Sequence, residues 1–235
     1  TPVLDLKGLL DIADLVEAMS RFQADGRYGL LAQRLVVAGL PREVAEALRG
    51  ADFCEQVGRF GRARQELERA RDALGDRLTG PAALFQQVLE SQLRRAGAQS
   101  LAEYQLALAG RALGYGDLLR SATWLLEAVI TAFLPPNADP DDVDLRKKTA
   151  EALRKGILGP ESLRRPFCEL TALRNALAHG RRRAEHPAVE RWLEEPGEVE
   201  RQLGRLFQQL RPAVVGGAGA KNFVNPLGNS LRKKE

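Results

Sequence analysis

Apolar residues recur at helical spacing along almost the whole of this chain, and this feature restricts its fold most. Near the N-terminus, residues at the i, i+3, i+4, i+7 spacing of one helix face are Leu6, Leu9, Leu10, Ala13 and Val16. No stretch alternates apolar and polar residues over more than a few positions, and isoleucine is rare, so the usual signs of strands are missing. The sequence therefore predicts an all-α protein, a helical bundle.

Composition adds limits on the class of protein. Hydrophobic residues make up 44% of the 235 residues, which is enough for a packed core. No uninterrupted apolar run is long enough for a membrane span, and the first residues do not read as a signal peptide, so we expect a cytoplasmic protein. Cys54 and Cys168 are far apart and have no histidine at metal-ligand spacing, so we interpret both as buried thiols.

The charge of the chain is mildly basic, with a formal net charge of +4 and a pI near 9.3. This balance is compatible with a polyanionic partner, because arginine can bind phosphate through two parallel hydrogen bonds. A composition rich in Arg, Leu, Ala and Gly is equally typical of a GC-rich genome. Net charge alone therefore does not identify a partner.

Start and stop signals divide the chain into helices and loops. Helices are predicted over residues 6–25, 41–48, 53–74, 81–95, 107–134 with a break at 114–117, 144–155, 160–179, 187–194 and 198–210. Ser100 and Glu103 predict a capping box, Pro166 is expected to bend or restart its helix, and 135–144 is the clearest internal loop. We predict an N-terminal helical region over 1–96, a second helical domain over 97–212 and a flexible basic tail over 213–235.

The helix that ends at Gly180 carries the residues best suited to chemistry. Its predicted core-facing stripe consists of Phe167, Leu170, Leu173 and Leu177. Asn175 and His179 fall on the other side of the helix, and Arg174 falls at the edge of the apolar stripe. Because Gly180 ends the helix, His179 lies in its last turn, where the helix dipole favours a cation by roughly 0.3 to 2 kcal/mol.

Such a set of side chains suits the cleavage of RNA without a metal ion or cofactor. The attacking 2′-hydroxyl must lose a proton, the leaving 5′-oxygen must gain one, and the phosphorane carries negative charge. His179 could move the protons and Arg174 could hold the phosphate, while Asn175 could orient His179 or bond the phosphate. DNA lacks the 2′-hydroxyl, so this chemistry predicts specificity for RNA.

The segment Arg174-Asn175-Ala176-Leu177-Ala178-His179 resembles the Arg-x(4–6)-His motif of HEPN domains, including the Asn after Arg and the Gly after His. The preceding region, particularly 111–133, is similar to the helical part of CRISPR-associated CARF and HEPN ribonucleases. The resemblance is specific over about residues 160–182 and diffuse over 100–160. It implies a HEPN-type domain over 97–212, which acts as a metal-independent endoribonuclease on single-stranded RNA in CRISPR-linked or other antiviral defence.

The resemblance also implies a homodimer, in which two motif helices form one composite site. In such CRISPR proteins an upstream CARF domain senses cyclic oligoadenylate, and no strand-rich segment of this chain suits that domain. Arg181, Arg182 and Arg183 follow the motif and are candidates for tracking an RNA backbone, with a solvated basic turn as the equal alternative. His186 is expected to lead into the next helix.

Two other functions stay open at this stage. The first is a non-catalytic helical module for dimerisation or interaction, of a tetratricopeptide-like kind, in which the motif helix only mediates a contact between chains. The second is the toxin of a HEPN toxin and nucleotidyltransferase antitoxin pair, which would share the chemistry and differ in its partner.

Overall fold

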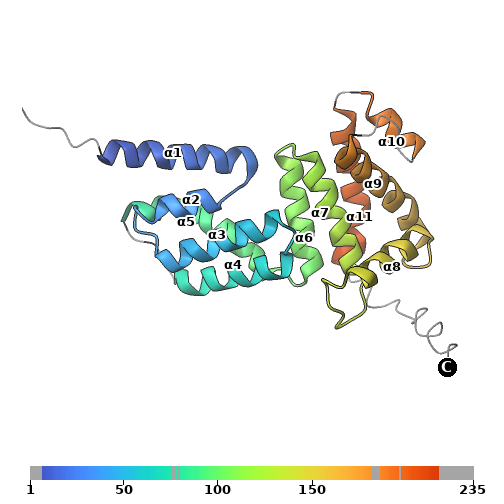
Figure 1. Ribbon diagram of the computed structural model, residues 1–235, viewed down its shortest axis with the longest axis horizontal. Coiled ribbons are helices and arrows are strands. Elements are labelled where there is room, and N and C mark those ends of the chain that lie inside the picture. The colour runs from blue at the N-terminus through green and yellow to red at the C-terminus, as the bar shows by residue number, and fades with distance from the viewer. Residues whose placement is uncertain (1–6, 76–77, 79, 181–185, 196, 217–235) are drawn as a thin grey trace, which may run out of the picture. The chain divides into compact units, whose positions relative to one another are not determined.

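The computed structural model describes residues 7–75, 78, 80–180, 186–195 and 197–216 (Figure 1). These residues form helices and turns and contain no strand, which confirms the all-α class. None of the described helices is long and apolar enough to cross a membrane. The chain divides into two compact units, with the boundary between Tyr104 and Gln105.

The first unit is built around helix α3. Its elements are α1 (Lys7–Asp25), α2 (Gly29–Leu35), α3 (Arg42–Gln56), α4 (Phe60–Leu74), the 3-10 helix η1 (Gly80–Phe85), α5 (Gln86–Leu93) and η2 (Arg94–Gly97), with the start of α6 (Leu101–Gly114). Helix α3 packs against α2 on one side and α4 on the other, and α4 contacts α5 and η2. Leu31, Leu48 and Leu67 from α2, α3 and α4 are fully buried and form the centre of this core.

The predicted helix break at residues 50–51 is wrong. Helix α3 continues through Gly50 to Gln56, and the chain turns instead at Gly58, whose φ of 75° favours glycine. Gly50 faces α4, and a Cβ added there would lie 3.3 Å from Cδ of Glu66. Gly50 therefore lies in the contact between the two helices, whereas the sequence pattern suggested a stop. The seven-residue α2 was not predicted, because so short a segment has little periodicity.

The start of α6 follows the predicted capping pattern. The Glu103 backbone N–H donates to Ser100 Oγ at 3.1 Å, and the Glu103 carboxylate accepts from the Gln99 N–H at 3.0 Å. The boundary between the two units lies inside α6, whereas the sequence places a domain boundary between 96 and 97. Sequence signals locate the ends of a helix and do not show which neighbours its first turn contacts.

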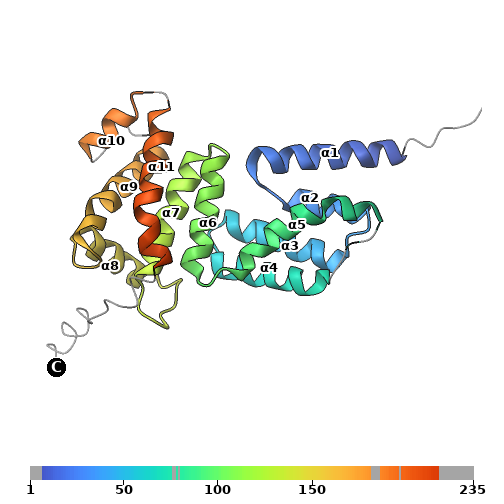
Figure 2. The same cartoon turned by 180° about the vertical axis from the view of Figure 1, so that it is seen from behind.

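The second unit is built around three long helices that contact one another. Its elements after α6 are α7 (Leu118–Ala132), α8 (Val143–Arg154), α9 (Glu161–His179), α10 (Pro187–Trp192) and α11 (Glu198–Val215). Helices α7, α9 and α11 pack together, and α8 and α10 pack on α9; Figure 2 shows α11 beside α7 and α9. Helices α6 and α7 form the predicted hairpin, in which the Ser121 hydroxyl donates to the Ala109 carbonyl at 2.9 Å.

Two prolines lie inside helices of this unit. Helix α9 runs through Pro166, so of the bend or restart expected there the restart does not occur, and α11 runs through Pro212 to Val215. The prediction that residues from 213 onward form a tail is therefore wrong for Ala213 and Val214, which are buried in α11. Each proline removes one backbone hydrogen bond, and apolar burial on the same helix offsets that loss. The rest of the predicted tail, 217–235, lies outside the described residues.

Candidate functional site

The apolar face of α9 positions the motif. Phe167, Leu170 and Leu173 are 0–1% exposed and pack in the core as predicted. Leu177, which the periodicity places on the same stripe, is partly exposed. The helix ends at Gly180, whose φ of 58° is left-handed and whose N–H donates to the Ala176 carbonyl. The predicted helix end, with a histidine in its last turn, is therefore confirmed.

The three motif side chains differ in exposure. His179 is exposed and Asn175, one turn earlier on the same face, is partly exposed; within the described residues neither side chain has a hydrogen-bond partner. Arg174 is partly buried, and its Nε is buried without a partner among the described residues. His179 lies five positions after Arg174, which corresponds to about 140° around a helix. One copy of α9 therefore does not bring the guanidinium and the imidazole onto one face.

The remaining sequence candidates have different outcomes. Arg181, Arg182 and Arg183 lie outside the described residues. His186 leads into the next helix as expected, because its Nδ1 accepts from the Ala188 N–H at 3.3 Å and caps α10. Cys54 is buried as predicted, but Cys168 is only partly buried, so the prediction of a buried thiol is wrong for Cys168.

A buried glutamate on α9 is the main feature that sequence reasoning missed. Glu169 is 1% exposed and accepts hydrogen bonds from Arg165 at 2.9 Å and from Arg205 of α11 at 2.6 Å. The Arg205 guanidinium also lies 5.5 Å from the ring centroid of Trp192 in α10. The side chains of Glu169, Arg205 and Trp192 thus connect α9, α11 and α10. Glu169 lies about one and a half helical turns before Arg174. The Arg165–Glu169 spacing was a visible signal, but Arg205, 36 residues away, was not.

The Glu169 carboxylate is expected to make the free energy of unfolding depend on pH. Burial raises the pKa of this carboxyl, but the hydrogen bonds from Arg205 and Arg165 outweigh burial and leave the pKa below its usual value. A depressed folded-state pKa adds stability that is present at neutral pH and is lost as the pH falls below about 4. Glu169→Gln should therefore be less stable than the wild type by about 1–3 kcal/mol at pH 7, with a gap that narrows in acid. Urea unfolding followed by the fluorescence of Trp124 and Trp192 measures this difference in stability, and a difference that is constant with pH would contradict the assignment.

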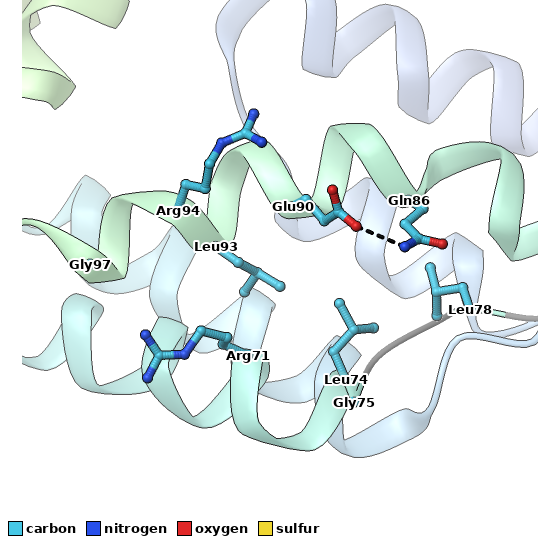
Figure 3. Close-up of a pocket in the computed structure, with 9 residues that line it drawn as sticks. All are labelled: Arg71, Leu74, Gly75, Leu78, Gln86, Glu90, Leu93, Arg94 and Gly97. Atoms are coloured by element: carbon cyan, nitrogen blue, oxygen red, sulfur yellow. Dashed lines mark hydrogen bonds between the residues drawn. The ribbon is translucent and has the colours of Figure 1, made fainter.

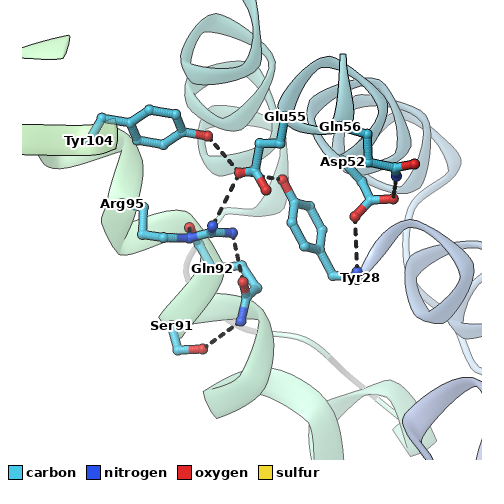
Figure 4. A network of polar contacts seen from close by, with 8 residues as sticks. All are labelled: Tyr28, Asp52, Glu55, Gln56, Ser91, Gln92, Arg95 and Tyr104. Atoms are coloured by element: carbon cyan, nitrogen blue, oxygen red, sulfur yellow. Dashed lines mark hydrogen bonds and ion pairs between the residues drawn. The ribbon is translucent and has the colours of Figure 1, made fainter. Parts of the chain in front are cut away.

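The first unit contains a buried polar network of its own (Figure 4). Oε1 of Glu55 accepts from the hydroxyls of Tyr28 at 3.0 Å and Tyr104 at 2.6 Å, and from the Arg95 guanidinium at 3.1 Å. Burial, and next the Glu55 carboxylate, raise the pKa of Tyr28 well above its usual value, so its hydroxyl stays a donor. Glu55 therefore links α2, α3, η2 and α6.

A cavity of about 440 Å³ lies between α4 and α5 in the first unit (Figure 3). Leu74, Leu78 and Leu93 line it, and Gln86 donates to Glu90 at 2.7 Å on its wall. No residue of the α9 motif lines this cavity, which belongs to the other unit. The cavity is therefore not part of the motif site.

Comparison with known proteins yields no relative: no family model, no curated protein and no solved structure matches this chain.

Proposed function

We propose that this chain is a HEPN-type endoribonuclease that cleaves single-stranded RNA without a metal ion. The observation that carries the proposal is the placement of His179, which is exposed in the last turn of α9, one turn beyond Asn175. Arg174 lies on another face of the same helix, with a buried Nε that has no partner among the described residues. The Arg-x-x-x-x-His spacing on a late helix of an all-helical chain is the motif of that family.

The proposed reaction is a transesterification within the RNA. The 2′-oxygen attacks the adjacent phosphorus as an imidazole takes its proton, and the 5′-oxygen leaves as a second group gives it one. Arg174 compensates the negative charge that develops on the phosphorane, and Asn175 holds His179 or the phosphate by hydrogen bonds. The products are a 2′,3′-cyclic phosphate, which can hydrolyse to a 3′-phosphate, and a 5′-hydroxyl.

A composite site from two copies supplies the groups that one copy lacks. One α9 carries one motif histidine and one motif arginine on different faces, whereas the reaction needs a base, an acid and a cation around one phosphate. A twofold contact between two α9 helices would provide two histidines and two arginines. We therefore propose that the active form is a homodimer, with antiviral defence as the setting that the family resemblance implies.

The proposal is tested by cleavage of a fluorescent single-stranded RNA in EDTA, beside a matched DNA and an RNA with one 2′-deoxy linkage. We expect cleavage of the RNA, none of the DNA, and a block at the single modified linkage, because the nucleophile is missing there. Product ends that carry cyclic phosphate identify the reaction, and sedimentation gives the oligomeric state.

Two outcomes would contradict the proposal. Cleavage at the 2′-deoxy linkage would exclude attack by the 2′-oxygen. A folded dimer that leaves the RNA intact at high protein concentration would favour the interaction module, in which α9 mediates only the contact between chains.

A further inference from the structure

A second candidate surface lies on the first unit, between α2 and α3. Two adjoining hollows of about 250 Å³ each share Gln33 and Arg49 in their walls and together form one groove, named here the α2–α3 groove. The first hollow extends to Arg27 and Phe53, and the second extends to Arg42. The groove is therefore lined by three arginines and one aromatic ring.

The arginines of α3 are arranged along one stripe. Arg42 and Arg49 are seven residues apart, which places them on the same helix face about 10 Å apart along the axis. Both are exposed, and within the described residues neither has an ion pair. The Arg27 guanidinium lies 3.9 Å from the Asp52 carboxylate, the outer limit of an ion pair. Two acids, Glu46 and Asp52, line the groove against three arginines, so the cationic side chains are in excess by one.

Phe53 is an exception among the described phenylalanines. Its exposure is 61%, whereas Phe22, Phe60, Phe133 and Phe167 are at most 9% exposed and Phe85 and Phe207 are only partly exposed. It lies one turn after Arg49 on the same stripe of α3. An exposed ring beside unpaired cations is the arrangement on which single-stranded nucleic acids stack their bases while their phosphates meet positive charge.

A buried hydrogen bond joins α3 to Tyr28, the residue that precedes α2, and so links the two walls of the groove. Asp52 accepts from the Tyr28 N–H at 3.2 Å and from the Gln56 amide at 2.7 Å (Figure 4), so its charge is engaged inside the unit. Gly29 of α2 passes so close that a Cβ there would lie 2.9 Å from Asp52 Oδ2. The spacing of α2 and α3 is therefore set by the fold and does not depend on a ligand.

We infer that the α2–α3 groove binds single-stranded RNA, with a base stacked on Phe53 and phosphates on Arg42 and Arg49. The inference rests on the proposed function for the identity of the polymer. An acidic amphipathic peptide would need a continuous apolar strip. Here Gln33, Arg49 and Gln56 interrupt the apolar side chains, and amides and guanidiniums suit bases and phosphates better.

The test measures RNA binding by fluorescence anisotropy on the full chain carrying His179→Ala, in EDTA, over a series of salt concentrations. Adding Arg42→Gln and Arg49→Gln together should lower the slope of log affinity against log salt by about 1.4, or about 0.7 for each lost phosphate contact. Adding Phe53→Ala should weaken binding at least about fivefold, and Phe53→Tyr should keep it, because stacking needs the ring. Arg71→Gln, an exposed arginine of α4, is the matched control and should change neither quantity.

The expected result is a lower slope in the arginine variant and weaker binding in Phe53→Ala, with an unchanged Arg71→Gln. Equal affinity and slope in all variants would overturn the inference, as would binding of an acidic helical peptide without any binding of RNA. The outcome is separable from that of the proposed nuclease. If RNA binds the groove but the wild-type chain never cleaves RNA, only the nuclease proposal is contradicted. If the wild-type chain cleaves RNA but the groove variants bind RNA as tightly as before, only the groove inference is contradicted.

Discussion

Replacing His179 with alanine is expected to lower the rate of RNA cleavage by about 10²- to 10⁴-fold, the usual contribution of a positioned acid or base. The side chain is exposed, so its removal should leave the fold and the melting temperature unchanged. Initial rates on a fluorescent RNA in EDTA, at equal concentrations of folded protein, measure the effect.

The chain offers a matched control in its other histidine. His186→Ala removes the cap of α10 and should cost about 1 kcal/mol of stability while cleavage stays near the wild-type rate. If both variants cleave as fast as the wild type, His179 does not transfer a proton in the reaction. If both lose cleavage together, the loss reflects the fold around α10 and not the chemistry of His179.

Replacing Glu55 with alanine is expected to destabilise the first unit by about 3–5 kcal/mol. The substitution leaves two tyrosine hydroxyls and the Arg95 guanidinium without their shared acceptor in a buried environment. Leaving a buried charge unpaired costs far more than removing a carboxylate from the surface.

Hydrogen exchange with peptide resolution is the suitable measurement, because both tryptophans, Trp124 and Trp192, lie in the second unit. We expect faster exchange in α2, α3 and the start of α6, and unchanged exchange in α9 and α11. Glu46→Ala, an exposed glutamate on the same helix, is the control and should change stability by no more than about 0.5 kcal/mol. Unchanged exchange throughout Glu55→Ala would show that the network adds no net stability.

Much of α9 could be predicted because its signals are local. The apolar residues Phe167, Leu170 and Leu173 repeat with the period of a helix, and Gly180 supplies the left-handed residue that ends it. The exposure of His179 follows from the same period, since it lies away from that stripe. The chemical role of His179 stays a prediction, because neither exposure nor spacing measures proton transfer.

The predicted helix ends at Gly50 and Pro212 were wrong because a local stop signal competed with packing between helices. Gly50 is a helix-stop signal in the sequence, yet α3 continues through it, with that face of the helix against Glu66 of α4. Pro212 is likewise a stop signal, yet α11 continues because Ala213 and Val214 find buried positions beyond it. In both places the contacts between helices outweigh the preference of a single residue.

The sequence by itself determined the helical class, most helix ends and the position of the Arg-Asn-x-x-x-His segment at the end of α9, because each depends on residues within about one or two turns of each other. Only the tertiary structure decided that Glu169 pairs with Arg205, that Glu55 meets Tyr28 and Tyr104, and that α2 and α3 enclose a groove. The three pairs of residues are 27 to 49 positions apart in the sequence. The path of the folded chain sets such contacts, and no short sequence pattern records it.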